Sequence, residues 1–201
     1  MQTPRDTWEE RYGADDYVFG VEPNDFLREQ VASLDPGDAL CIAEGEGRNA
    51  VHLATLGWNV ESFDLTEAGV RKTTALAGSR GVEVMARVAD AADFDLGVER
   101  WDLIVSIFAH MPPPVRRDLH RRVVAALRPD GRFVLEAYRP EQLGRGTGGP
   151  PVAELMMSLD ALRSELEGLE FEIAIETERS VVEGTGHTGD ACVVQIVARR
   201  P

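Results

Sequence analysis

The sequence has little cysteine, and it contains no long hydrophobic run. Only two of its 201 residues are cysteine, Cys41 and Cys192, and both lie in apolar segments typical of strands. Cysteines in such segments are more often buried free thiols than a disulfide pair, so they favour a reducing compartment. No pair of histidines or cysteines has the spacing of metal ligands, and we therefore expect no metal site.

Positive charge is also scarce. The chain has 21 Lys and Arg against 35 Asp and Glu, a formal net charge of −14. Nucleic-acid phosphates require a basic surface, so this composition argues against a nucleic-acid partner. No apolar run approaches the length of a membrane span, and the polar start MQTPRDTWEERYG lacks the apolar core of a signal peptide. We expect a soluble, cytoplasmic protein, either a monomer or a homodimer, with no membrane partner.

The residues that are present suffice for a folded domain. Hydrophobic residues make up 43% of the chain, which is ordinary for a globular protein. The length favours one domain over residues 1–201. Its first segment, residues 1–35, is rich in aromatic residues, among them Tyr12, Tyr17 and Phe19. This segment is either a lid over a site or an N-terminal helix packed on the core.

Strands and helices alternate through the first two thirds of the chain. Strands are expected at 39–43, 59–64, 82–88, 102–108 and 132–138. Helices are expected at 23–34, after the glycine turn up to Gly57, from an N-cap at Thr66 to Gly81, and at 113–127. Such alternation is typical of right-handed βαβ units in a parallel sheet.

The last third of the chain departs from this pattern. A glycine-rich loop, GRGTGGPP at 144–151, precedes a helix expected near 159–166. Two β-rich runs, 171–182 and 191–199, are joined by EGTGHTGD and are typical of an antiparallel hairpin. The predicted fold class is α/β, with a Rossmann-like, mostly parallel seven-stranded sheet, helices on both faces and a C-terminal antiparallel hairpin.

A glycine turn follows the first expected strand. Gly45-Glu46-Gly47-Arg48-Asn49-Ala50 fits the pattern G-x-G-x-x-A, and Asp64 follows about 20 residues later. No Gly-Lys-Ser/Thr follows, which excludes a P-loop. The pattern fits a small nicotinamide-dependent oxidoreductase, although the chain has no room for a large substrate domain.

The motifs in their order resemble those of class I S-adenosylmethionine (SAM) methyltransferases. They are similar to the small bacterial enzymes related to the tellurite-resistance protein TehB and, more distantly, to thiopurine methyltransferases. The matching segments are WEERY, YVFGVEPN, GEGRNAVHLA, FDLT, VADAADF, WDLIVSIFAHMPP, LRPDGRFVLEAY and TGGPP. The resemblance implies transfer of the sulfonium methyl group of SAM to a small acceptor, such as a thiol or a tellurium or selenium oxyanion. A SAM-binding module without turnover is the alternative.

The resemblance also implies which residues bind SAM. The glycine turn and the first N–H groups of its helix would hold the methionyl part, Asp64 the ribose hydroxyls, and Asp90 with Ala91 the adenine. The full expected set is Tyr17, Phe19, Glu44, Gly45, Gly47, Arg48, Asn49, Asp64, Leu65, Asp90, Ala91 and Phe108. The family's glycine motif begins with an acidic residue and then a glycine, where this chain has Cys41 and Ala43. We expect Glu44 to replace the missing acid.

Three basic groups are candidates for the acceptor side and for catalysis: Arg11, His110 and Arg139. His110 follows the fourth parallel strand, at the edge where open α/β sheets bind ligands. There it could accept a proton or bind an anionic acceptor, or it could simply bond a loop carbonyl. The other histidines carry less weight. His52 is expected to be structural, His120 to be exposed, and His187 to lie in the hairpin loop.

Overall fold

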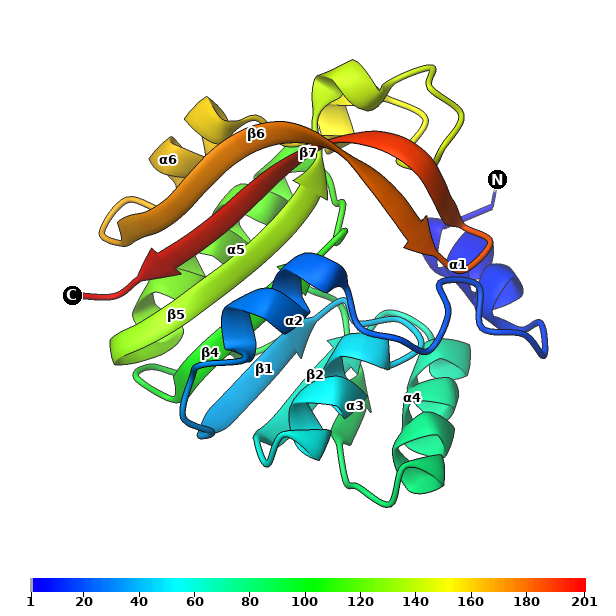
Figure 1. Ribbon diagram of the computed structural model, residues 1–201, viewed down its shortest axis with the longest axis horizontal. Helices are drawn as coiled ribbons and strands as arrows, with labels where there is room; N and C mark the ends of the chain where they lie inside the picture. The colour runs from blue at the N-terminus through cyan, green and yellow to red at the C-terminus, as the bar shows by residue number, and fades with distance from the viewer. Residues whose placement is uncertain (1) are drawn as a thin grey trace.

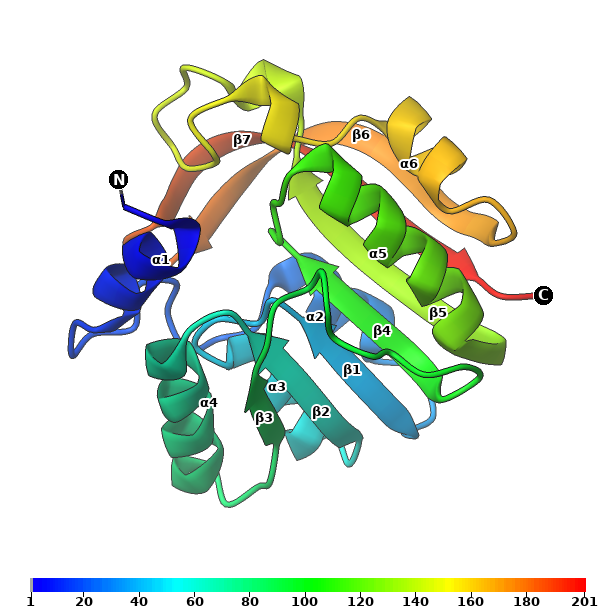
Figure 2. The same cartoon turned by 180° about the vertical axis from the view of Figure 1, so that it is seen from behind.

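A single mixed sheet forms the centre of the protein (Figures 1 and 2). The computed structural model describes residues 2–201. The strands are β1 (Asp38–Ile42), β2 (Asn59–Asp64), β3 (Met85–Val88), β4 (Trp101–Ile107), β5 (Leu127–Tyr138), β6 (Glu170–Glu183) and β7 (His187–Arg199). Their order is β3-β2-β1-β4-β5-β7-β6. Strands β1 to β5 pair in parallel, and β7 pairs antiparallel with both β5 and β6. The predicted fold class is confirmed.

Helices cover both faces of this sheet. They are α1 (Pro4–Tyr12), α2 (Asp25–Val31), α3 (Arg48–Thr55), α4 (Glu67–Ser79), α5 (Pro113–Ala126) and α6 (Leu159–Glu165), with two 3-10 turns, η1 (Pro140–Gln142) and η2 (Ala153–Leu155). Apolar residues of α2 and α3 pack on one face, and those of α5 and α6 pack on the other. Within residues 2–201, no helix is both long and apolar enough to cross a membrane.

Helix starts follow their sequence signals. The expected N-cap Thr66 accepts the N–H of Gly69, and Asn24 and Ser158 cap α2 and α6 in the same way. Helix α2 is shorter than the expected 23–34, because the cap at Asn24 sets its start and Ala32 its end. Strand β3 begins at Met85 rather than 82, since its pairing with β2 starts only there.

The C-terminal hairpin is longer than the sequence predicts. Strands β6 and β7 pair as far as Glu183 and His187, so only Gly184, Thr185 and Gly186 form the turn. Gly184 has φ 62°, a left-handed conformation that glycine adopts without strain. The turn packs on the N-terminal segment, where Thr185 and Gly186 donate N–H bonds to the carbonyl of Val18. This contact brings the hairpin to the edge of the sheet where α1 lies (Figure 1).

The glycine turn has little space for a side chain at Gly47. This residue has φ 97°, and a Cβ there would lie 2.6 Å from the Thr73 Cα. We expect Gly47→Ala to lower the free energy of unfolding by about 1–3 kcal/mol or more, from backbone strain and overlap together. Gly78→Ala is the matched control: a Cβ meets nothing within 4 Å in α4. It should raise stability by up to about 1 kcal/mol. Urea unfolding of both variants tests this, and equal effects would contradict it.

Candidate functional site

A cavity of about 500 Å³ opens at the carboxyl ends of β1, β2 and β4. Parallel strands present their following loops at this edge, which is where ligands of open α/β sheets bind. Nine of the residues expected to bind SAM line it: Phe19, Glu44, Arg48, Asn49, Asp64, Leu65, Asp90, Ala91 and Phe108. Tyr17, Gly45 and Gly47 do not line it. The Tyr17 hydroxyl instead donates to the carbonyl of Lys72.

The start of α3 is capped by Glu44. Because Gly47 offers no side chain at the N-cap position, Glu44 Oε1 accepts the N–H groups of Asn49 (2.8 Å) and Ala50 (2.9 Å). The N–H of Asn49 is therefore already bonded, contrary to the expectation that it is free for a methionyl carboxylate. Burial, partly offset by these two bonds, raises the pKa of Glu44 to about 7.

Position 41 of the glycine motif lies in the core. Cys41 is fully buried inside β1, and it does not line the cavity. Ala43 lines the cavity with φ 47°, a left-handed conformation that favours glycine. The backbone at Ala43 thus has the conformation that the family's glycine would allow. Glu44 and Glu46 are the carboxylates of this turn that line the cavity, and Glu46 is already paired with Lys72 at 2.8 Å.

Asp64 ends β2 at the cavity wall. Its Oδ2 accepts the N–H of Gly45 (2.9 Å), and its Oδ1 accepts both the N–H (2.9 Å) and the hydroxyl (2.7 Å) of Thr66. Burial raises the pKa of this carboxyl. A carboxylate offers about four acceptor positions, so the bonds fix its orientation and leave a lone pair on Oδ2. That lone pair can accept one ligand hydroxyl.

Helix α1 covers the cavity and is bonded to α4. Glu9 accepts the N–H groups of Glu67 (2.9 Å) and Ala68 (3.0 Å), which are free donors at the start of α4. Trp8, Tyr12 and Phe19 line the cavity, with the Trp8 and Tyr12 ring centroids 5.3 Å apart. The N-terminal segment therefore lies over the site, as a lid would.

His110 lines the cavity, but the backbone occupies both of its ring nitrogens. Nδ1 lies 3.0 Å from the carbonyl oxygen of Leu155, and the N–H of Tyr138 donates to Nε2 at 3.3 Å. Burial lowers the pKa of His110 to about 4, so the ring is neutral at pH 7. This neutral, doubly bonded ring favours the structural role that the sequence left open.

The basic groups expected around the acceptor do not converge. Arg139 does not line the cavity, and its Nε donates to Glu141 at 3.1 Å. Arg11 also lies outside the lining, with its guanidinium 4.6 Å from the centre of the Trp8 ring. Neither side chain lines the cavity as expected, because Arg139 bonds Glu141 and Arg11 packs on Trp8, each within its own segment.

Two other histidines differ from the sequence-based expectation. His120 is buried rather than exposed, because α6 brings Glu165 to within 2.7 Å of its Nδ1. His187 is buried at the start of β7 and lines the cavity, rather than lying in a loop. Its ring centroid lies 4.4 Å from that of Phe19 and 4.6 Å from that of Phe108. No local sequence signal marks His187, since its placement depends on the length of the hairpin.

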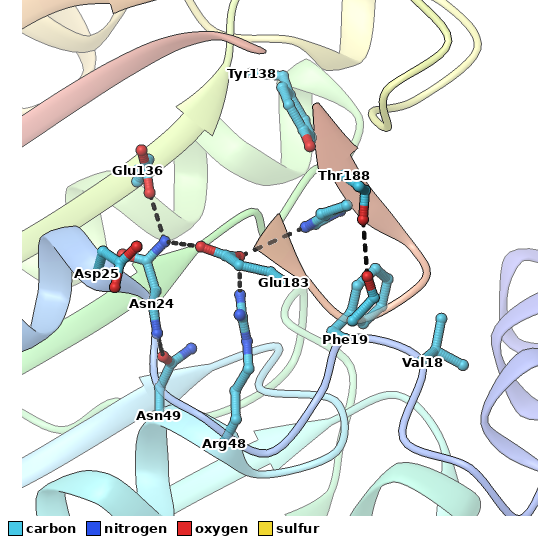
Figure 3. Close-up of polar contacts among 12 residues, drawn as sticks. Val18, Phe19, Asn24, Asp25, Arg48, Asn49, Glu136, Tyr138, Glu183 and Thr188 are labelled. Carbon is cyan, nitrogen blue, oxygen red and sulfur yellow. Dashed lines mark hydrogen bonds and ion pairs between the residues drawn. The ribbon is translucent and has the colours of Figure 1, made fainter. Parts of the chain in front are cut away.

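A buried network of charged groups supports this side of the cavity (Figure 3). Arg48 Nη2 donates to Glu183, and Arg179 donates to both Glu136 and Glu183. The amide of Asn24 donates to both carboxylates. Burial alone would raise the pKa of Glu183, but the nearby His187 and the ion pair with Arg48 lower it to about 2. Glu183 is therefore ionised at neutral pH.

Comparison with known proteins gives one family and a set of similar structures. Residues 39–131 match the model of a family described as a methyltransferase domain. No curated protein sequence matches the chain significantly.

Solved structures are similar over nearly the whole chain. One, solved for the conversion of a disulfide bond into a thioacetal group during echinomycin biosynthesis, is 24% identical with a TM-score of 0.75, covering 96% of this chain and 87% of that one. TehB from Haemophilus influenzae is 16% identical with a TM-score of 0.73, covering 98% of this chain and 67% of that one. The N-methyltransferase NodS from Bradyrhizobium japonicum, in complex with S-adenosylhomocysteine, is 18% identical with a TM-score of 0.73, covering 97% of each chain. Residues 39–131 are thus similar to a methyltransferase domain, and nearly the whole chain has the fold of these solved structures, TehB among them.

Proposed function

We propose that the protein transfers the methyl group of SAM to a small-molecule acceptor bound in the cavity under α1. The observation that carries the proposal is one unpartnered N–H donor group of an arginine at the cavity wall, whose other end is paired with Glu183. Arg48 is 7% exposed and lines the cavity, and its Nη1 has no hydrogen-bond partner within residues 2–201. A buried donor without a partner costs about 1–3 kcal/mol, which a ligand carboxylate would recover.

The residues around Arg48 fit the remaining parts of SAM. Nη1 of Arg48 would hold the methionyl carboxylate, Glu44 the ammonium group and Oδ2 of Asp64 a ribose hydroxyl. Asp90 and Leu65 would flank the adenine. When bound, SAM supplies an electrophilic methyl group, so the protein's share of catalysis is to orient the acceptor and exclude water.

The acceptor that we propose is a soft nucleophile, a thiol. We also propose that residues 1–201 form a single functional domain. Apolar side chains, among them Trp8, Phe108, Met111 and Val115, line much of the cavity. Such walls disfavour a strongly hydrated oxyanion, since Arg11 and Arg139 do not line the cavity. Of the arginines that do line it, Arg48 is assigned to the methionyl carboxylate and Arg5 is exposed to solvent. The similar structure from echinomycin biosynthesis concerns a sulfur substrate, which is consistent with a thiol here.

Titration calorimetry tests the cofactor part of the proposal. S-adenosylhomocysteine should bind and NAD should not. Asp64→Ala should weaken S-adenosylhomocysteine binding about 10-fold to 100-fold, because a charge-assisted bond is worth about 1.5–3 kcal/mol. Asp35→Ala, an exposed acid in the loop before β1, is the matched control and should bind normally.

Circular dichroism of Asp64→Ala separates lost binding from lost folding. Unchanged affinity in a folded Asp64→Ala protein would contradict the ribose assignment, and NAD binding would favour an oxidoreductase. Release of S-adenosylhomocysteine from SAM in the presence of thiols distinguishes an enzyme from a SAM-binding module without turnover.

A further inference from the structure

His187 is the histidine of the cavity whose nitrogens the backbone does not occupy. Within the described residues, Nδ1 of His187 has no hydrogen-bond partner and only a 3.8 Å ion-pair contact with Glu183, whereas both nitrogens of His110 contact the backbone. His187 lies between the rings of Phe19 and Phe108. These contacts orient the imidazole at the cavity wall without using its nitrogens.

A carboxylate stands behind this imidazole. Glu183 Oε2 lies 3.8 Å from His187 Nδ1, at an ion-pair distance. Glu183 is itself held by Arg48 (Figure 3) and by Arg179. The Cδ2 edge of the ring is covered by Gly148, where a Cβ would come within 3.0 Å. With Nδ1 toward Glu183 and Cδ2 under Gly148, the edge left for the cavity is the one that carries Nε2.

We propose that His187 is the general base that deprotonates the acceptor, and that Glu183 is the residue that positions it. The inference rests on the proposed function and deepens it. It specifies an acceptor that still carries its proton at neutral pH, such as an alkyl thiol. The charge of Glu183, 3.8 Å from Nδ1, favours the tautomer with its proton on Nδ1, which leaves Nε2 free to accept a proton, and it stabilises the imidazolium that forms.

The step balances in protons and electrons. The S–H proton of the acceptor passes to His187 Nε2, and the freed sulfur lone pair forms the new bond to the methyl carbon. The electron pair of the broken carbon–sulfur bond stays on the leaving sulfur, which becomes a neutral thioether. His187 then returns the proton to solvent, so the protein ends unchanged.

The charges around His187 are compatible with this role. The titratable groups that face it are Glu183 of β6, Arg48 of α3, Tyr138 of β5, Arg11 of α1 and His110 after β4. Burial, together with the charges of Arg48 and Arg11, lowers the pKa of His187, while Glu183 opposes this. The imidazole is therefore neutral at pH 7 and can accept a proton.

Two thiol probes separate general-base catalysis from binding. Benzyl mercaptan is protonated at pH 7 and needs a base, whereas 4-nitrothiophenol is already ionised. His187→Gln should lower turnover of benzyl mercaptan about 10²-fold to 10⁴-fold, the usual contribution of a general base. Turnover of 4-nitrothiophenol and the affinity for S-adenosylhomocysteine should stay within about threefold of the wild type. His52→Gln, on α3 outside the cavity lining, is the matched control and should leave both turnovers unchanged.

A second readout needs no turnover. In an NMR titration of the protein without SAM, Glu183→Gln should lower the pKa of His187 further, because it removes the charge that favours the imidazolium. If this variant does not fold, the His187→Gln comparison still decides the proposal.

Several results would overturn the inference. Equal losses on both thiols, or no loss on benzyl mercaptan, would show that His187 is not a base. The inference is also wrong if the wild type binds S-adenosylhomocysteine but methylates no protonated thiol. In that case the proposed cofactor is still supported. Failure to bind S-adenosylhomocysteine at all would instead overturn the proposed function.

Discussion

Replacement of Arg179 by methionine is expected to lower the free energy of unfolding by about 3–5 kcal/mol. Arg179 donates to Glu136 Oε1 (2.6 Å) and Oε2 (2.8 Å) and to Glu183 Oε1 (3.0 Å). Glu136 is fully buried and Glu183 nearly so. Without the guanidinium, two buried carboxylates face each other with one cation fewer, and removal of one partner from such a group is costly.

Arg145→Met is the matched control for Arg179→Met. Arg145 forms a comparable two-point contact with Glu178, but at the surface. Solvent screens that pair, so its loss should change stability little. Guanidinium unfolding of both variants at pH 7 checks the difference. Similar effects of the two substitutions would mean that the buried network contributes no more than a surface ion pair.

Affinity for S-adenosylhomocysteine is expected to fall by up to about tenfold per pH unit below pH 7. The ligand's ammonium group prefers an ionised carboxylate, and burial raises the pKa of Glu44 to about 7. Acidification therefore removes the charge that we propose receives the ammonium. Calorimetry from pH 8 to pH 5.5 measures the slope. Glu44→Gln should bind more weakly at pH 8 and show a much flatter profile, whereas Cys41→Ser should retain the wild-type profile.

The same raised pKa has the opposite effect on stability. Between the ordinary value of 4.5 and about 7, the folded protein keeps a proton on Glu44 that the unfolded chain has released. This contribution is therefore fully present below pH 4.5 and is lost as the pH rises through 7, by about 1.4 kcal/mol per unit in that window. Saturating S-adenosylhomocysteine should flatten this loss. Equal pH slopes of stability for the wild type and Glu44→Gln would contradict the raised pKa.

Local sequence signals predicted most of the fold. Alternating apolar runs and glycine turns place the five parallel strands, and Thr66 gives the start of α4 to the residue. These features depend on neighbours within a few residues, so a pattern in the sequence contains them. The hairpin length was not predictable in this way, because the turn at Gly184 is completed by the distant carbonyl of Val18.

The candidate site was predictable only in part, for the same reason. Glu44 lies directly before the glycine turn in the sequence. Asp64 ends β2, the strand that pairs with β1. Both line the cavity. Arg11 and Arg139 were expected at the site from their positions alone, but nearby partners hold them outside it. His187 reaches the cavity through a hairpin that returns from β6, a placement that no spacing in the sequence encodes.

The place of β7 in the sheet has a consequence for synthesis of the protein. The last strand of the chain lies between β5 and β6 rather than at an edge, and it carries Gln195, whose amide donates to Glu136. A nascent chain still held by the ribosome before residue 187 would present the unpaired edge of β5, with Glu136 short of a donor. The cavity, lined from Thr3 to His187, is complete only once this strand is released. SAM should therefore stabilise the protein only after β7 has joined the sheet.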